Sequence, residues 1–222
     1  MSVVSETVDW FSRAATWSGQ DGIPNRLLEH LGYTALTVGV AAVVAVPLGL
    51  YIGHTGRLRG LAVAFTGAIR ALPTLGLLTW FALIVGIGLT APITALVLLA
   101  VPPLLAGVYS GVESVDRRTV DAARAQGMTE LQILARVEVP LGLPIILGGL
   151  RSATLQVVAT ATVGAYIGLG GLGRYIIDGK ASSDYPQMLG GSLVVVVVAL
   201  LIDGAWALAQ SLTSGRRTRV LA

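Results

Sequence analysis

Three groups of residues in this sequence are candidates for chemistry, and the surrounding chain argues against each. His30 and His54 are the only two histidines, but an apolar run separates them, so they cannot bind one metal ion together. Gly168, Gly170 and Gly173 fit the G-x-G-x-x-G pattern of dinucleotide-binding loops. That pattern needs a preceding strand and a following ribose-binding acid, and both are missing here. No GxxxxGK(S/T) phosphate loop and no Cys occur, so we expect no catalytic residue, metal site or cofactor in this chain.

One acid, Asp203, lies within an apolar segment. Ionisable residues at membrane depth mark proton or sodium pathways in secondary transporters. A single acid, in a chain without a convincing inverted repeat, is weak support for that class. We therefore expect Asp203 to pair with a neighbouring group or to face a wet cavity.

A polar island, DAARAQGMTELQILARVEVP, covers Asp121 to Pro140 between long apolar runs. It is charged, rich in Arg and composed largely of helix-forming residues. We expect a helix, a turn at Gly127 and a second helix that ends before Pro140. The small side chains of Ala122 and Ala123 would let the first helix approach a cleft closely. A membrane protein that keeps such a segment on one side usually presents it to a soluble partner.

The composition indicates an integral membrane protein. Hydrophobic residues make up 54% of the chain, charged residues 12%, and the mean hydropathy is +0.78. Buried helices of a large soluble enzyme are excluded, because so few charges cannot cover a soluble surface. Runs without Asp, Glu, Lys or Arg are each long enough for a membrane helix of about 20 residues: Leu31–Gly53, Ala71–Val112, Ser152–Gly173 and Tyr185–Ile202.

The elements that must position these residues are five membrane helices in an all-α fold. Gly86, Gly88 and Pro92 divide the longest run into two spans. The expected spans are Leu31–Tyr51, Leu72–Ile87, Ala91–Tyr109, Leu143–Ile167 and Leu189–Leu208. The second could begin earlier, because Leu61–Ile69 is also apolar. An external interfacial segment over 1–30 would precede a membrane domain over 31–210, and a basic tail over 211–222 would follow.

Prolines in or near the first three spans have two readings. Membrane helices tolerate proline, so these residues could be structurally neutral. Alternatively, each favours a kink that lets helices rearrange around a central pathway. The candidate pathway or hinge residues are Pro73, Thr74, Pro102 and Pro103.

Arginine placement predicts the orientation, because cytoplasmic loops carry an excess of Arg and Lys. With five spans, one side holds Arg57, Arg59, Arg117, Arg118, Arg124, Arg136, Arg216, Arg217 and Arg219. The opposite side holds Arg13, Arg26, Arg174 and Lys180. The N-terminus is therefore expected outside, and the polar island and C-terminus in the cytoplasm. These flanks account for the net charge of +3, so no nucleic-acid partner is needed.

The polar island also resembles a known signature. Its D-A-A-x-x-x-G-x9-V-x-V-P pattern is similar to the E-A-A-x-x-x-G-x9-I-x-L-P motif of binding-protein-dependent ABC importer permeases. The residues on motif positions are Asp121, Ala122, Ala123, Gly127, Val137, Val139 and Pro140. The departures are Asp for Glu, and Val for Ile and for Leu. The resemblance implies a coupling loop over 113–142 through which ATP hydrolysis on another chain moves the helices.

The resemblance covers roughly Leu31 to Asp203. The blocks RALPTLGLL, VPPLLAGVYSGVESVD, GLPIILGGLRSAT and IGLGGLGRYIIDG are similar to permeases of osmoprotectant importers for glycine betaine, carnitine and choline. Methionine permeases share the five-span plan and the late glycine cluster, so a methionine-type permease stays open. A further alternative is an ATP-independent secondary transporter or channel.

The resemblance implies a type I importer permease fold in a prokaryotic cell membrane. It implies a second permease subunit, identical or paralogous, and two cytoplasmic ATPase subunits that bind ATP and Mg. It also implies a substrate-binding protein outside, for which Gly170, Gly171 and Gly173 are candidate outer-face contacts. We expect no fused binding domain, since only a short basic tail follows Leu208.

Overall fold

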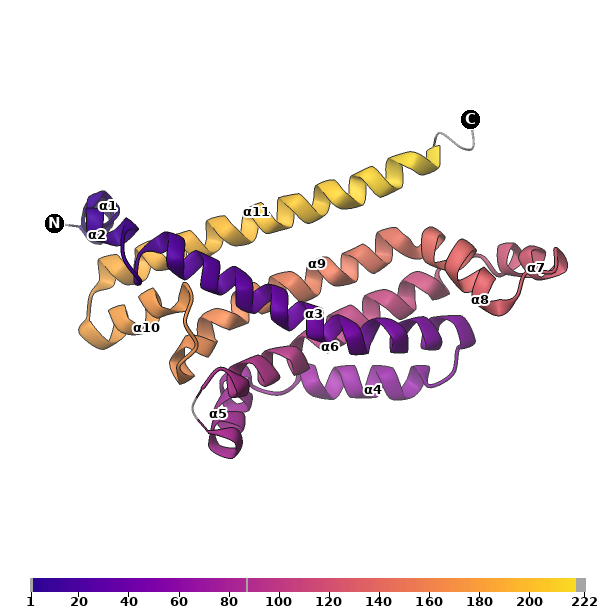
Figure 1. Ribbon diagram of the computed structural model, residues 1–222, viewed down its shortest axis with the longest axis horizontal. Helices are drawn as coiled ribbons and strands as arrows, with labels where there is room; N and C mark the ends of the chain where they lie inside the picture. The colour runs from indigo at the N-terminus through magenta and orange to yellow at the C-terminus, as the bar shows by residue number, and fades with distance from the viewer. Residues whose placement is uncertain (1, 87, 219–222) are drawn as a thin grey trace. The chain divides into compact units, whose positions relative to one another are not determined.

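The computed structural model describes residues 2–86 and 88–218, and within those ranges the chain is helical, without a β-strand (Figure 1). The expected all-α fold is therefore confirmed. The α-helices are α1 (Val3–Ser12), α2 (Ala14–Trp17), α3 (Ile23–Thr55), α4 (Arg59–Arg70), α5 (Thr74–Val85), α6 (Thr90–Glu113), α7 (Arg117–Ala125), α8 (Glu130–Ile133), α9 (Val139–Gly164), α10 (Gly173–Ser182) and α11 (Tyr185–Thr218). A π-helical turn, η1, covers Leu134–Glu138, and a 3-10 turn, η2, covers Ala165–Ile167.

Four of the described helical segments are long and apolar enough to cross a membrane, and a fifth crossing is possible. The four cover Ile23–Thr55, Thr90–Glu113, Glu130–Ile167 and Tyr185–Thr213. The fifth is the pair α4 and α5, which passes the same test together but is bent by 89° at its break. The five predicted spans fall on these segments.

The second predicted span covers α5, and the earlier start that the sequence left open for it corresponds to α4. Helix α4 begins at Arg59, as the apolar stretch before Arg70 suggested. The break follows from Pro73, which lacks an N–H, disfavours helical geometry at Leu72 and stands as the extended N-cap of α5. The predicted end of this span at Ile87 lies outside the described residues.

Two helices are longer than the uncharged sequence segments from which the membrane spans were predicted. α3 begins at Ile23, within the expected N-terminal segment, and α11 continues to Thr218, within the expected tail. Residues 219–222 of that tail lie outside the described residues. Helices outlast the apolar runs because a charged side chain at a helix end can reach the lipid headgroups or water.

Residues Met1–Val38, Leu72–Leu98 and Thr154–Ile202 form one compact unit, here called the first unit. Trp10 of α1 packs edge-on against Tyr175 of α10, with ring centroids 5.4 Å apart. Trp10 is only 5% exposed, because Gly190 of α11 leaves room for its ring. The N-terminal segment was expected at the lipid interface, whereas its Trp10 is part of a protein core.

Burial raises the pKa of Tyr175 to about 12. Its hydroxyl therefore keeps its proton and donates to the carbonyl oxygen of Asp21 at 2.5 Å. This bond ties α10 to the turn that precedes α3.

The second unit contains residues Gly39–Ala71, Leu99–Ala153 and Asp203–Ala222. Its helices α6 and α9 approach so closely that a Cβ on Gly107 would lie 2.3 Å from the Cα atom of Gly149. α3 packs on α6 in the same way, since a Cβ on Gly53 would lie 2.6 Å from that of Val112. Backbone contact through small residues is a common way for membrane helices to associate. Figure 1 shows α7 and α8 of this unit beyond the ends of α6 and α9.

Candidate functional site: the loop between α6 and α9

The first half of the loop is α7, and both of its ends are capped. Asp116 begins the helix by accepting a hydrogen bond from the N–H of Arg118 at 2.9 Å. At the other end, Gly127 has φ +82°. The N–H of Gly127 donates to the carbonyl of Arg124 at 2.9 Å, and that of Met128 to the carbonyl of Ala123 at 3.2 Å. This pair of bonds is a Schellman motif, so the predicted turn at Gly127 is confirmed.

The second half begins with a capping box. Thr129 Oγ1 accepts from the N–H of Gln132 at 3.3 Å, and Gln132 Oε1 accepts from the N–H of Thr129 at 2.9 Å. This cap fixes where α8 begins.

The predicted end of the second helix before Pro140 is wrong. The chain stays helical from α8 through η1 into α9. In η1 the N–H of Val139 bonds to the carbonyl of Leu134, five residues back. A proline cannot donate to the ladder, and its ring clashes with the preceding turn of a regular α-helix. The wider π turn accommodates Pro140, so the helix continues past it.

The loop has a small core of its own. Val115, Val120, Ala123 and Ile133 are buried together, with Met128 and Val137 packed against them. Of the two motif alanines, Ala123 is 7% exposed and Ala122 is exposed. Within the loop, the methyl group of Ala123 fills this core, and the close approach of the helix to a cleft stays a prediction. Asp121 and Pro140 are exposed, and Val139 is half-buried.

An ion-pair network links α7 to α8 across the turn. Arg124 binds Glu130 with two nitrogens, Nε to Oε1 at 2.8 Å and Nη2 to Oε2 at 2.9 Å. Its Nη1 also donates to Asp121 at 3.1 Å, so the first motif residue is part of the network. The hydrogen bonds to Glu130 raise the pKa of Arg124. These groups are exposed, so water and salt weaken the network and its main effect is orientation.

The end of α3 is joined to this loop by His54. Its Nδ1 lies 2.5 Å from Glu138 Oε2, and its Nε2 lies 3.0 Å from Glu130 Oε2. Glu138 is 3% exposed. The sequence reasoning treated His54 only as a failed metal ligand and overlooked Glu138. A single acid within the apolar VEVP segment was the available signal.

The loop also exposes a large apolar side chain that the motif does not include. Leu131 of α8 is 75% exposed, and Asp121 and Ala122 of α7, in the same loop, are exposed as well. An exposed leucine alone needs no explanation. On a loop that buries Val120 and Ile133 in its core, it is a candidate contact for a partner.

The candidate outer-face glycines pack within the first unit. Gly171, with φ +79°, donates its N–H to Glu29 Oε2 at 2.8 Å. A Cβ on Gly170 would lie 2.6 Å from the same oxygen, and one on Gly173 would lie 2.4 Å from the carbonyl of Thr162. These glycines therefore allow close packing after the fourth predicted span. Gly171 and Gly173 are buried, which leaves only Gly170 partly open to a partner.

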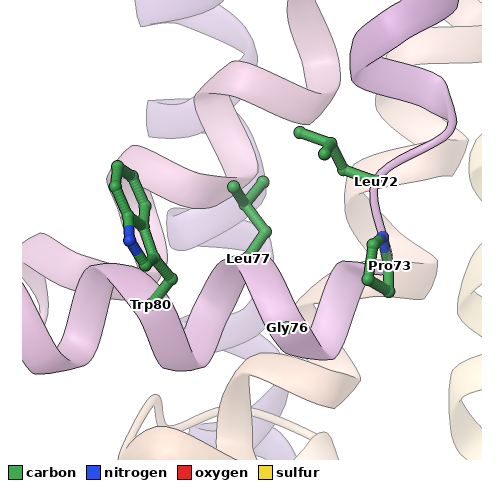
Figure 2. Close-up of a pocket in the computed structure, with 5 residues that line it drawn as sticks. All are labelled: Leu72, Pro73, Gly76, Leu77 and Trp80. Carbon is green, nitrogen blue, oxygen red and sulfur yellow. The ribbon is translucent and has the colours of Figure 1, made fainter.

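The candidate hinge residues lie in different units. Pro73 belongs to a hollow of about 330 Å³ with Leu72, Gly76, Leu77 and Trp80 (Figure 2). Figure 2 shows Leu77 and Trp80 projecting from the same side of α5. Thr74 is half-buried, and it does not line the hollow. Pro102 and Pro103 are inside α6 in the second unit, buried and half-buried respectively.

Asp203 has the neighbour that was expected. Arg151 of α9 binds it with Nε and Nη2, at 2.6 and 2.7 Å, within the second unit. Arg151 was not singled out as a partner from the sequence, although it interrupts the apolar residues of the fourth predicted span. The pair ties α11 to α9 without an isolated charge at membrane depth.

Several apolar helices with an ordered polar loop between two of them are typical of a transport permease. Residues 45–210 match the family described as the binding-protein-dependent transport system inner membrane component. The chain therefore belongs to this family. It is a multi-pass membrane permease subunit and not an enzyme.

Named relatives and a solved structure agree with this assignment. The carnitine transport permease protein OpuCD of Listeria monocytogenes serotype 1/2a (strain 10403S) is 30% identical over 204 residues, 91% of this chain and 89% of the relative. The glycine betaine/carnitine/choline transport system permease protein OpuCB of Bacillus subtilis (strain 168) is 33% identical over 175 residues, 79% and 81% of the two chains. The MetNI methionine ABC transporter, in an inward-facing conformation, shares the fold at a TM-score of 0.75 and 24% identity, over 86% of this chain and 95% of that chain.

Proposed function

We propose that this chain is the permease of an ATP-driven importer of small quaternary-ammonium osmoprotectants such as glycine betaine, carnitine or choline. The observation that carries the proposal is the set of relatives with such names, aligned over most of the chain. The likeness to the methionine transporter is a likeness of fold alone, and it does not favour methionine. An ATP-independent channel fits poorly with the family and with the ordered loop.

The proposed assembly has two permease chains, two cytoplasmic ATPase subunits that bind ATP and Mg, and a substrate-binding protein outside. The N-terminus lies outside and the C-terminus inside, as the arginine distribution favours. The loop between α6 and α9 docks on the ATPase. Its contact surface is the exposed set of Asp121, Ala122 and Leu131, while Ala123 and Gly127 give the loop its shape.

Coupling follows from how the loop is attached. α8 continues through η1 into α9, so a displacement of the loop is passed directly to that span. The close contact of Gly107 with Gly149 carries α6 along with α9. The motif residues Val137, Val139 and Pro140 lie along this connection, and Val137 fastens it to the core of the loop.

The permease itself holds the solute weakly. High-affinity recognition of a quaternary ammonium favours several aromatic faces in one cage. The hollow beside α5 offers one such face, Trp80, which is 55% exposed among apolar neighbours. One aromatic face allows passage and release, so the affinity site belongs to the binding protein.

The test is reconstitution in liposomes with the native ATPase and binding protein. Glycine betaine on the binding protein should stimulate ATP hydrolysis and drive uptake, and omitting the binding protein should abolish both. If methionine and not betaine stimulates ATP hydrolysis, the substrate is of the methionine type and the proposed substrate class is wrong. Micromolar betaine binding to the permease alone would contradict the weakly selective pathway.

A further inference from the structure

His54 lies between two carboxylates at the place where α3 meets the loop. Its two ring nitrogens face different acids, Nδ1 facing Glu138 at 2.5 Å and Nε2 facing Glu130 at 3.0 Å. The exposed fractions of the side chains are 12% for His54, 4% for Glu138 and 57% for Glu130. The contact joins positions far apart in the sequence, and the motif does not include His54.

The geometry calls for a proton that a neutral imidazole lacks. Neutral histidine has one N–H, whereas an ionised carboxylate can only accept hydrogen bonds. Both contacts are satisfied together when the ring carries two N–H groups and is a cation. If that proton leaves, one nitrogen faces a carboxylate lone pair, and repulsion replaces attraction.

Charged groups from η1, α8 and α7 lie around His54. η1 contributes Glu138 and α8 contributes Glu130, and Glu130 is also bound by Arg124 of α7. The other ion pair that joins helices near this end of α3, Arg59 of α4 with Glu113 of α6, includes neither acid. Glu138 is covered by protein and has His54 as its contact, so a neutral ring would turn its single N–H toward this buried carboxylate and lose its bond to the more exposed Glu130.

His54 also occupies a mechanical junction. α3 is packed on α6 through Gly49 and Gly53, each of which faces a valine of α6 without room for a Cβ. The bonds of His54 add a second attachment, from the end of α3 to the loop itself. With His54 charged, α3 follows α6 and the loop together. With His54 neutral, only one ring nitrogen can donate, so one of its two bonds to the loop is lost.

We propose that protonated His54 is a positioning residue that fixes the inner end of α3 to the coupling loop, so that movement of the loop reaches α3. Coupling between ATP hydrolysis and transport therefore depends on the proton at His54. This proposal rests on the proposed function, since it presumes that the loop docks on an ATPase.

The experiment measures glycine betaine taken up per ATP hydrolysed, using the whole reconstituted transporter between about pH 6 and pH 9, a range that spans histidine titration. The wild-type ratio should fall toward high pH. His54→Gln should lower the ratio about fivefold at low pH, the size expected for losing a partly exposed ion pair, and remove its pH dependence. His54→Lys supplies a cation through the whole range and should keep the ratio high at pH 9.

Arg59→Gln is the matched control, because it breaks a different ion pair of the second unit. It should keep the wild-type pH profile, and a flattened profile in this variant would overturn the specific role of His54. A wild-type ratio that is constant across the range would overturn the proposal without any variant, as would wild-type behaviour of His54→Gln. If His54→Gln fails to assemble with the ATPase, a His54→Lys profile that still falls like the wild type would overturn it. Absence of betaine-stimulated hydrolysis in the wild type would instead contradict the proposed function.

Discussion

At the scale of single residues, the motif positions divide into those that shape the loop and those that face outward. Gly127 is required by backbone geometry, because its φ of +82° lies in the left-handed region. Ala123 is required by packing, because it sits in a core of four buried residues. Ala122 and Asp121 have no such internal reason to be small or acidic beyond the contact of Asp121 with Arg124.

Substitutions of Gly127 should lower transport to different degrees, according to how well the new residue tolerates left-handed backbone geometry. Among the described residues, no atom lies within 4 Å of a Cβ built there, so the cost is backbone strain and not a clash. Gly127→Asn should lower betaine uptake modestly, because Asn tolerates left-handed geometry. Gly127→Val should lower it severely, with about 1–2 kcal/mol of local strain. Equal uptake by both variants, measured at matched membrane abundance, would remove the role of the turn.

Substitution by leucine should affect stability at Ala123 and binding of the ATPase at Ala122. Ala123→Leu overpacks the loop core and should destabilise it by about 1–3 kcal/mol. Ala122→Leu changes an exposed position and should leave thermal stability in detergent unchanged while it reduces co-purification of the ATPase. The reverse assignment of these two effects would contradict the partition of the motif into core and surface.

At the scale of elements, the second unit is held by helices whose backbones touch. α6 and α9 contact at Gly107 and Gly149, and again where a Cβ on Gly142 would lie 2.3 Å from the carbonyl oxygen of Gly111. The same two helices carry the ends of the loop, α6 before it and α9 after it. Their contact therefore determines how far apart the two ends of the loop are.

Gly107→Ala should be disproportionately damaging for a single added methyl group. A Cβ there would lie 2.3 Å from the Cα atom of Gly149, so the helices must separate or shift. We expect a loss of about 1–3 kcal/mol in stability, seen as a lower melting temperature in detergent. Gly39→Ala is the control, since among the described residues no atom lies within 4 Å of its Cβ. A melting temperature for Gly107→Ala equal to that of the control would show that the helix contact is looser than described.

Features that depend on neighbouring residues, such as the membrane spans, could be predicted from the sequence. Features that depend on contacts between distant residues could not. Long apolar runs predicted the spans, because the cost of exposing the backbone in lipid leaves helices as the only solution for such runs. A kink at Pro73 was one of the two predictions left open for the prolines, whereas the π turn before Pro140 was missed. The partners of His54 and Asp203 were not predictable, since Glu138 and Arg151 are far away in the sequence and charge alone does not select them.

At the scale of the whole molecule, the proposed orientation rests on where the basic residues lie. Lys180 of α10 and Arg57, between α3 and α4, are both exposed, and they belong to different units. The orientation assigns Lys180 to the outside and Arg57 to the cytoplasm. The position of the loop on the ATPase side depends on the same assignment.

Single cysteines can test this orientation cleanly, because the natural chain has none. A Lys180→Cys variant should react with an impermeant thiol reagent in intact cells, and an Arg57→Cys variant should react only after the cells are permeabilised. Both should react in permeabilised cells, which controls for burial. The opposite pattern would place the loop outside and overturn its role in coupling.

The π turn before Pro140 has a consequence for how the motif tolerates insertions and deletions. A π turn holds one more residue than the α-helical turn it replaces, and this extra residue lies within the nine-residue spacer between Gly127 and Val137 or directly after it. Deleting one residue from Leu134–Glu138 would return the helix to α register and rotate α8 and α7 by about 100° around the axis of α9. The fixed length of the spacer therefore determines the direction in which the exposed Ala122 and Leu131 face relative to α9.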